Sequence, residues 1–122
     1  MKKIIFTLSL LIAAGVSSMA QTKYMYHQMT AVESVVPGGL GRSRLISSNK
    51  DGSMEEVKLE NFFSLVGINF GNIKDNDKTI AAKIEEKVDD GWELMSVTPG
   101  VYSADKSTGI FITRYLFRKP KN

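Results

Sequence analysis

Apolar and polar residues alternate over five stretches of the chain. A period of two is typical of β-strands, because successive side chains point to opposite faces of a sheet. The pattern predicts strands over residues 23–36, 43–48, 54–59, 92–97 and 110–118. The segment Asn49-Lys50-Asp51-Gly52 predicts a tight turn between the second and third strands. Pro99-Gly100 is expected to close the fourth strand, with a continuation over Val101-Tyr102 left open.

A different period appears over residues 77–90. Apolar residues recur there at intervals of three and four, which predicts an amphipathic helix. The residues of this stripe are Ile80, Ala81, Ile84 and Val88. Asn76 or Asp77 is expected to cap the first turn. Gly91 is expected to end the helix in the left-handed conformation.

The order of these elements favours an α+β fold with a mainly antiparallel sheet and one main helix packed on one face. The last strand is apolar on both sides, which predicts a central strand covered on both faces. The second face of the sheet then needs a cover. Either the apolar segment 62–70 or another copy of the chain is expected to supply it.

Large apolar residues are crowded between residues 60 and 73. We expect a short helical turn over residues 61–66, followed by irregular chain. The segment is interpreted either as core that covers the sheet or as a surface for a partner or for self-association. The residues of the expected interaction surface are Phe62, Phe63, Leu65, Ile68 and Phe70.

The first 20 residues have the layout of a secretory signal peptide. Met1-Lys2-Lys3 is a positive start, residues 4–16 are largely apolar, and Ser18-Met19-Ala20 offers small residues to a signal peptidase. The apolar run is shorter than the roughly 20 residues that span a bilayer. We therefore expect cleavage near Ala20-Gln21 and a periplasmic or secreted mature chain, residues 21–122, that forms a single small α+β domain without a membrane span.

Charge and cysteine content narrow the function classes. The formal net charge is +3, and the loss of Lys2 and Lys3 with the signal peptide lowers it to +1. Binding of nucleic acid through bulk charge is therefore not expected. The chain has no cysteine, which excludes thiol chemistry and disulfides.

The residues that usually carry catalysis or hold metals are sparse. His27 is the only histidine, and zinc sites need several His or Cys ligands. No Gly-x-Ser-x-Gly motif is present, so a serine hydrolase is not indicated. We predict no catalytic residue, no metal ligand and no cofactor.

One segment is suggestive of ligand binding. Glycines let backbone amides converge on an anion, and arginines grip carboxylate, sulfate or phosphate. The residues of this candidate anion site are Gly38, Gly39, Gly41, Arg42 and Arg44. The segment matches neither a P-loop nor a dinucleotide fingerprint. The alternative is a flexible connection between two strands.

Three short motifs together resemble a known family. They are Tyr24-Met25-Tyr26, the run Gly91-Trp92-Glu93-Leu94 after the helix, and the final Tyr115-Leu116-Phe117-Arg118-Lys119. Their order is similar to that of the small bacterial domains named domain of unknown function 4177. Residues 37–73 fall outside the resemblance and look like an insertion. The resemblance implies a compact α+β fold and carries no activity.

Taken together, these features indicate an exported binding or protein-interaction module of the bacterial envelope. Its partner is expected to be an envelope protein, another copy of the chain or a small anionic ligand. The alternatives are a self-associating structural or assembly component and a small enzyme. The enzyme would need carboxylates and Arg42, Arg44 or His27 to converge in space.

Overall fold

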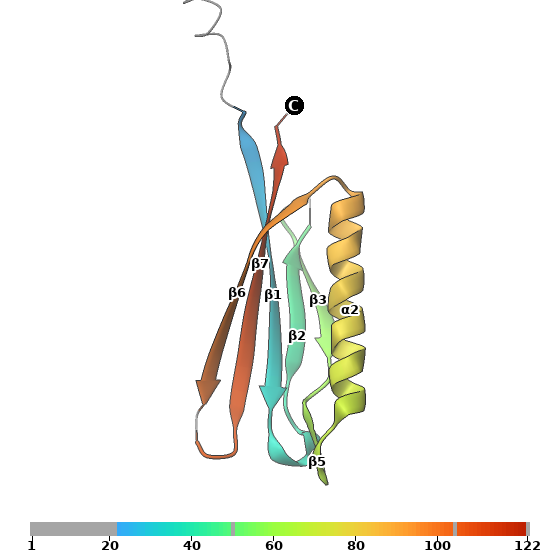
Figure 1. Cartoon of the computed structure of the whole chain (residues 1–122), viewed down its shortest axis with the longest axis vertical. Helices are drawn as coiled ribbons and strands as arrows, with labels where there is room; N and C mark the ends of the chain where they lie inside the picture. Colours follow the sequence, from blue (N-terminus) through green and yellow to red (C-terminus); the bar gives the residue numbers. More distant parts are fainter. Residues whose placement is uncertain (1–21, 50, 104, 122) are drawn as a thin grey trace, which may run out of the picture.

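The computed structural model describes residues 22–49, 51–103 and 105–121. The predicted signal peptide, residues 1–20, lies outside this part. One helix packs against one face of a five-stranded antiparallel sheet with the strand order β3-β2-β1-β7-β6 (Figure 1). The strands are β1 (Tyr24–Val35), β2 (Ser43–Ser48), β3 (Met54–Leu59), β6 (Glu93–Ser103) and β7 (Gly109–Pro120), and the helix is α2 (Phe70–Asp89). The predicted α+β class is confirmed.

The middle of the sheet is the long pair of β1 and β7. Their register runs from Tyr24 opposite Pro120 to Val35 opposite Gly109. Beyond the strand end, the amide of Lys121 donates to the carbonyl of Lys23 at 2.7 Å. Both ends of the described chain therefore lie at one end of the sheet (Figure 1).

The core lies between α2 and the sheet face toward it. The buried apolar side chains are Met29, Ala31, Leu45, Leu59, Ile80 and Phe117. They come from β1, β2, β3, β7 and the helix, so each of these elements contributes to one cluster. Burial of side chains of this kind from water is the main stabilising contribution to such a fold.

The opposite face of the sheet has no second layer in the part of the chain that the structure describes. Strand β7 lies inside the sheet, between β1 and β6, as predicted. It was expected to be covered on both faces, and this expectation is wrong. Phe117 on the helix side is buried, whereas Ile112 and Leu116 on the other side remain half-exposed.

Helix α2 begins earlier than the predicted start at Asp77. Asn69 is the N-cap, and its side chain accepts a hydrogen bond from the amide of Asn72 at 3.2 Å. Asn76, the expected cap, lies within the helix and is 1 % exposed. Its side chain accepts from the Glu60 amide at 2.7 Å and donates to the Glu60 carbonyl at 2.9 Å. These contacts with the chain after β3 explain a polar residue on the buried side of the helix.

Residues 63–68 form two short paired strands, β4 (Phe63–Ser64) and β5 (Gly67–Ile68). The expected helical turn over residues 61–66 is therefore wrong. The segment also does not cover the second face of the sheet. Phe62 contacts Phe111, with ring centroids 5.6 Å apart, and Phe111 lies on the same side of β7 as Phe117.

Strand β6 continues through Pro99 and Gly100, which were expected to end it. The proline is tolerated because β6 is an edge strand that pairs only with β7, so the missing amide hydrogen breaks no ladder bond. A bulge between Leu94 and Ser96 shifts the register near the start of the strand. The lower halves of β6 and β7 extend away from α2 (Figure 1).

Among the described residues, the structure contains no helix with the length and apolar character needed to cross a membrane.

Candidate functional site

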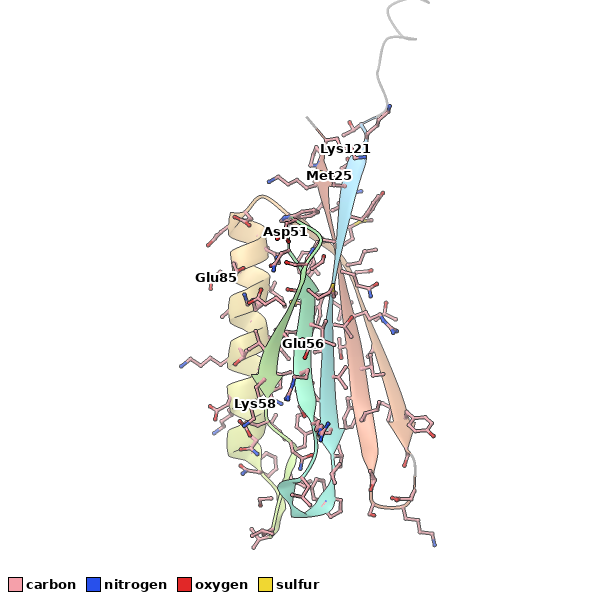
Figure 2. All side chains as sticks on the ribbon, turned by 180° about the vertical axis from the view of Figure 1, so that it is seen from behind. Met25, Asp51, Glu56, Lys58, Glu85 and Lys121 are labelled. Atoms are coloured by element: carbon pink, nitrogen blue, oxygen red, sulfur yellow. The ribbon has the colours of Figure 1, made fainter. Side chains whose placement is uncertain are left out.

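A cavity of about 770 Å³ opens where the last turn of α2 meets the start of β1 and the end of β7. Its volume lies within the roughly 300–1,000 Å³ usual for small-molecule sites. The lining residues are Met25, Tyr26, His27, Ser48, Asn49, Asp51, Glu86, Lys87, Asp90, Trp92 and Lys119. Figure 2 shows Met25 and Asp51 at this end of the molecule, while Glu56 and Lys58 lie farther down β3.

The end of α2 shapes one wall of the cavity. The amide of Trp92 donates to the Lys87 carbonyl at 3.0 Å, and the amide of Gly91 donates to the Val88 carbonyl at 2.9 Å. This is the Schellman arrangement, which requires a positive φ at the residue after the cap. Gly91 supplies it with a φ of 86°. The predicted glycine stop is confirmed, and it brings Lys87 and Trp92 to the same cavity.

Lys119 closes the helix end from the side of β7. Its ammonium donates to the carbonyl oxygen of Asp90. A cation at this position is favourable because the last carbonyls of a helix carry partial negative charge.

His27 is one of the lining residues of the cavity and is only 7 % exposed. Its ring lies 5.5 Å from that of Trp92 and 6.0 Å from that of Phe117, centroid to centroid. Nδ1 shares a hydrogen bond of 3.0 Å with the Ser48 hydroxyl. Nε2 is buried and has no hydrogen-bond partner among the described residues.

The environment of His27 favours its neutral form. Burial lowers the pKa of His27 from its ordinary value of 6.5, and the positive charge of Lys87 lowers it further. The direction of the Ser48 hydrogen bond decides which ring nitrogen carries the proton. When the hydroxyl donates to Nδ1, Nε2 carries a hydrogen and is an unused donor.

Lys87 is the second buried polar group at the cavity, with 8 % exposure. Within the described part of the chain its ammonium has neither a hydrogen bond nor an ion pair. The acids at the rim differ in this respect, because Glu86 pairs with Lys83 at 2.9 Å and Asp51 accepts from the Ser53 amide at 2.9 Å. Nζ is not among the fully buried atoms without a partner, so the stem of Lys87 is packed while its ammonium keeps contact with water. An ammonium in this place without a protein partner is available to an anion.

The contact between Ser48 and His27 does not make a hydrolytic triad. A catalytic imidazole needs an acceptor on its second nitrogen to orient it. In the described residues nothing accepts from Nε2, and Asp51 is engaged by its own turn through Ser53. No group of His, Asp and Glu side chains in these residues is arranged to hold a metal ion.

The glycine- and arginine-rich segment lies at the other end of β1. Gly38 and Gly39 belong to a short 3-10 turn, η1 (Pro37–Gly39), with φ values of 78° and 73°. Gly41 lies so close to the side chains of Ser34 and Asn61 that a Cβ atom would clash with both. This glycine is therefore needed for packing.

The two arginines of that segment do not join His27. Arg44 lies opposite Val32 on the face of the sheet away from α2. Its guanidinium donates to the Ser43 carbonyl at 2.8 Å and lies 3.9 Å from the Glu56 carboxylate. Arg42 is exposed. An enzyme was expected to need carboxylates together with Arg42, Arg44 or His27. His27 lines the same cavity as Asp51, Glu86 and Asp90, whereas the two arginines are not part of that lining.

The apolar segment is divided between partly buried and exposed residues. Phe62 and Phe63 are half-buried. Leu65, Ile68 and Phe70 are 89 %, 57 % and 69 % exposed. Val66 belongs to the crowded apolar segment but was left out of the expected interaction surface, and it is 97 % exposed beside Leu65 at the turn between β4 and β5.

Sequence reasoning missed most of the cavity. His27 was considered as a lone histidine and as one residue that an enzyme could use, and Lys87 was not part of any predicted site. The single signal was the run Gly91-Trp92, four residues after a lysine in the last helical turn. A helical wheel cannot show that the turn after the helix folds back over this lysine.

Comparison of the chain with models of protein families, with curated proteins and with solved structures found no match.

Proposed function

We propose that the chain is an exported binding domain of the bacterial envelope that takes a small ligand in the cavity at the end of α2. The observation that carries this proposal is the unpartnered Nε2 of His27, which is buried and belongs to the cavity lining. Buried polar atoms are nearly always satisfied, so an orphaned one at the bottom of a cavity is a natural ligand contact. Export with cleavage near Ala20-Gln21 is part of the proposal.

The site carries its own reporters. Trp92 is the only tryptophan and His27 the only histidine of the chain. Both contribute to the cavity, so tryptophan fluorescence and the histidine NMR signals report on this site alone. We expect a fragment library screened against residues 21–122 to yield compounds that shift both signals saturably.

The test variant is His27→Leu, which fills much of the same space and removes the orphaned nitrogen. Because it also removes the only histidine of the chain, Trp92 fluorescence is the readout. We expect binding to weaken in this variant and to persist in Lys74→Met, an exposed position on the same helix. A library without a single compound that shifts both signals would argue against a ligand cavity.

A second function is favoured by one observation, the apolar turn between β4 and β5. Leu65 and Val66 are almost fully exposed there, and Ile68 and Phe70 extend the patch. We propose self-association of two copies through this patch as the alternative. Sedimentation of residues 21–122 should then show a concentration-dependent dimer that Leu65→Ser plus Val66→Ser abolishes. A monomer at all concentrations would reject it.

Anion binding at Gly38, Gly39, Gly41, Arg42 and Arg44 stays a separate prediction. Replacing Arg42 and Arg44 by alanine should abolish any sulfate or phosphate binding that depends on this segment. Unchanged binding in the double variant would contradict this prediction. The likeness to domain of unknown function 4177 also stays a prediction.

A further inference from the structure

We propose that the ligand of the cavity is an organic carboxylate with a single negative charge. Its carboxylate lies between Lys87 Nζ and His27 Nε2, and its apolar body lies against Trp92 and Met25. This inference rests on the proposed function and names the class of ligand. It draws on three features of the cavity: its unused donors, the acids at its rim and its apolar wall.

The unused donors define the charge of the ligand. Lys87 and His27 are both more than nine-tenths buried as residues. Nε2 of His27 is a fully buried atom without a hydrogen-bond partner among the described residues. The Lys87 ammonium keeps some contact with water, and no group of the described chain binds it. Lys87 donates only, and Nε2 donates when the Ser48 hydroxyl donates to Nδ1. A carboxylate has two oxygens and accepts one bond from each group. Such charge-assisted bonds are stronger than neutral ones.

The rim limits the ligand to one negative charge. Among the described residues of the lining, the acids Asp51, Glu86 and Asp90 outnumber the cations Lys87 and Lys119. Glu86 is partly neutralised by Lys83, and Lys119 is already bound to the Asp90 carbonyl. A dianion such as a phosphate monoester would bring a second negative charge to a lining in which the described acids already outnumber the cations. Like charges at short range are repulsive, so a carboxylate fits better than a phosphate.

The third feature is the apolar wall. Trp92 is half-buried with its ring tilted over that of His27, and Met25 remains 39 % exposed at the mouth. Aromatic faces and methionine side chains favour flat apolar groups. The cavity of about 770 Å³ is large enough for a ring in addition to the carboxylate.

The test compares four probes with the same phenyl body and different head groups. They are phenylacetate, 2-phenylethanol, 2-phenylethylamine and benzyl phosphate. Each is titrated into residues 21–122, with Trp92 fluorescence and the His27 NMR signals as readouts. We expect phenylacetate to bind about tenfold or more tightly than each of the others, because only it matches the two donors without a second charge.

Variants assign the effect to the two donors. In Lys87→Met the preference for phenylacetate over 2-phenylethanol should disappear, while Lys74→Met should retain it. In Ser48→Ala the affinity for phenylacetate should fall, since the imidazole loses the group that fixes its tautomer. Chemical shifts away from the cavity verify that each variant is folded.

The outcomes separate the two proposals. If 2-phenylethanol or 2-phenylethylamine binds as well as phenylacetate, the cavity is a ligand site but the carboxylate inference is wrong. If benzyl phosphate binds as tightly as phenylacetate, the single-charge argument is overturned. If no probe moves either reporter at millimolar concentration, the carboxylate inference fails, and the fragment library decides whether the proposed function fails with it.

Discussion

The backbone amide of Trp92 donates to the carbonyl oxygen of Lys87 at 3.0 Å. This bond folds the chain back over the last turn of α2. The indole that follows the helix and the ammonium that ends it therefore line the same cavity. A helix stop thus also shapes a candidate binding site, and its glycine is the first position to test.

Gly91→Ala should destabilise the domain by about 1 kcal/mol, because the left-handed backbone at φ 86° disfavours a side chain. The added Cβ would also lie 3.3 Å from Lys119 Nζ. Urea unfolding measures the loss, and Trp92 emission should shift in the native state. Gly100→Ala is the control, since its Cβ would meet only an ordinary contact of 3.7 Å and its φ lies outside the left-handed region. Equal effects of the two changes would contradict the role given to Gly91.

Lys87→Met should make the free protein more stable, by about 1 kcal/mol. Methionine packs like the lysine stem and removes the charge from a side chain that is 8 % exposed and has no protein partner in the described chain. Thermal or urea unfolding of the two proteins checks this. Lys74→Met, at an exposed site, should change stability little. A strongly destabilised Lys87→Met would mean that the ammonium has a structural partner, and the argument for an unused donor would be lost.

The stability of the fold should fall as the pH drops below the ordinary His27 pKa of 6.5. Burial and Lys87 lower the pKa of His27 in the folded state, so the unfolded chain takes up the proton first. The contribution of His27 is complete above pH 6.5 and is lost as the pH falls through the folded-state pKa. Urea unfolding at several pH values measures it, and NMR titration gives the folded pKa directly.

His27→Gln separates this effect from that of the carboxylates, which titrate at lower pH. The variant should show a flatter pH dependence of stability between about pH 7 and pH 5. A folded-state pKa at or above 6.5 would show that the imidazole is not desolvated as the structure indicates.

Asn76→Ala should cost about 2–3 kcal/mol of stability. The change leaves the amide and carbonyl of Glu60 without their partners in a partly buried place. Lys78→Ala, at an exposed position two residues farther along α2, is the control. The stability of this variant should stay near that of the wild type. The midpoint of urea unfolding is a sufficient readout. Equal midpoints for the two variants would show that the bonds to Glu60 contribute little.

Much of the fold follows from local pattern. The strands over residues 43–48 and 54–59 have the predicted bounds. The helix ends at the predicted position, where Gly91 adopts the positive φ that glycine tolerates. These elements depend on alternation, turn residues and the unique φ range of glycine, all of which act over a few residues. The class α+β follows from their order.

Two of the errors share one cause, which is tertiary contact. The start of α2 was placed too late because Asn76 looks like a cap, whereas it bonds to Glu60 across the core. Strand β6 was expected to end at Pro99, and it continues because the edge position needs no amide hydrogen there. In each case the partner is distant in sequence, so no local pattern contains the information.

The sequence alone determined the class of fold, the helix stop and the shortage of catalytic and metal-binding residues. The tertiary structure alone decided which polar groups are buried without partners. Burial and hydrogen bonding depend on which strands become neighbours, and β1, α2 and β7 meet at the cavity from opposite ends of the chain. For this reason His27 and Lys87 became candidates for ligand binding only in the folded domain, where neither has a protein partner in the part that the structure describes.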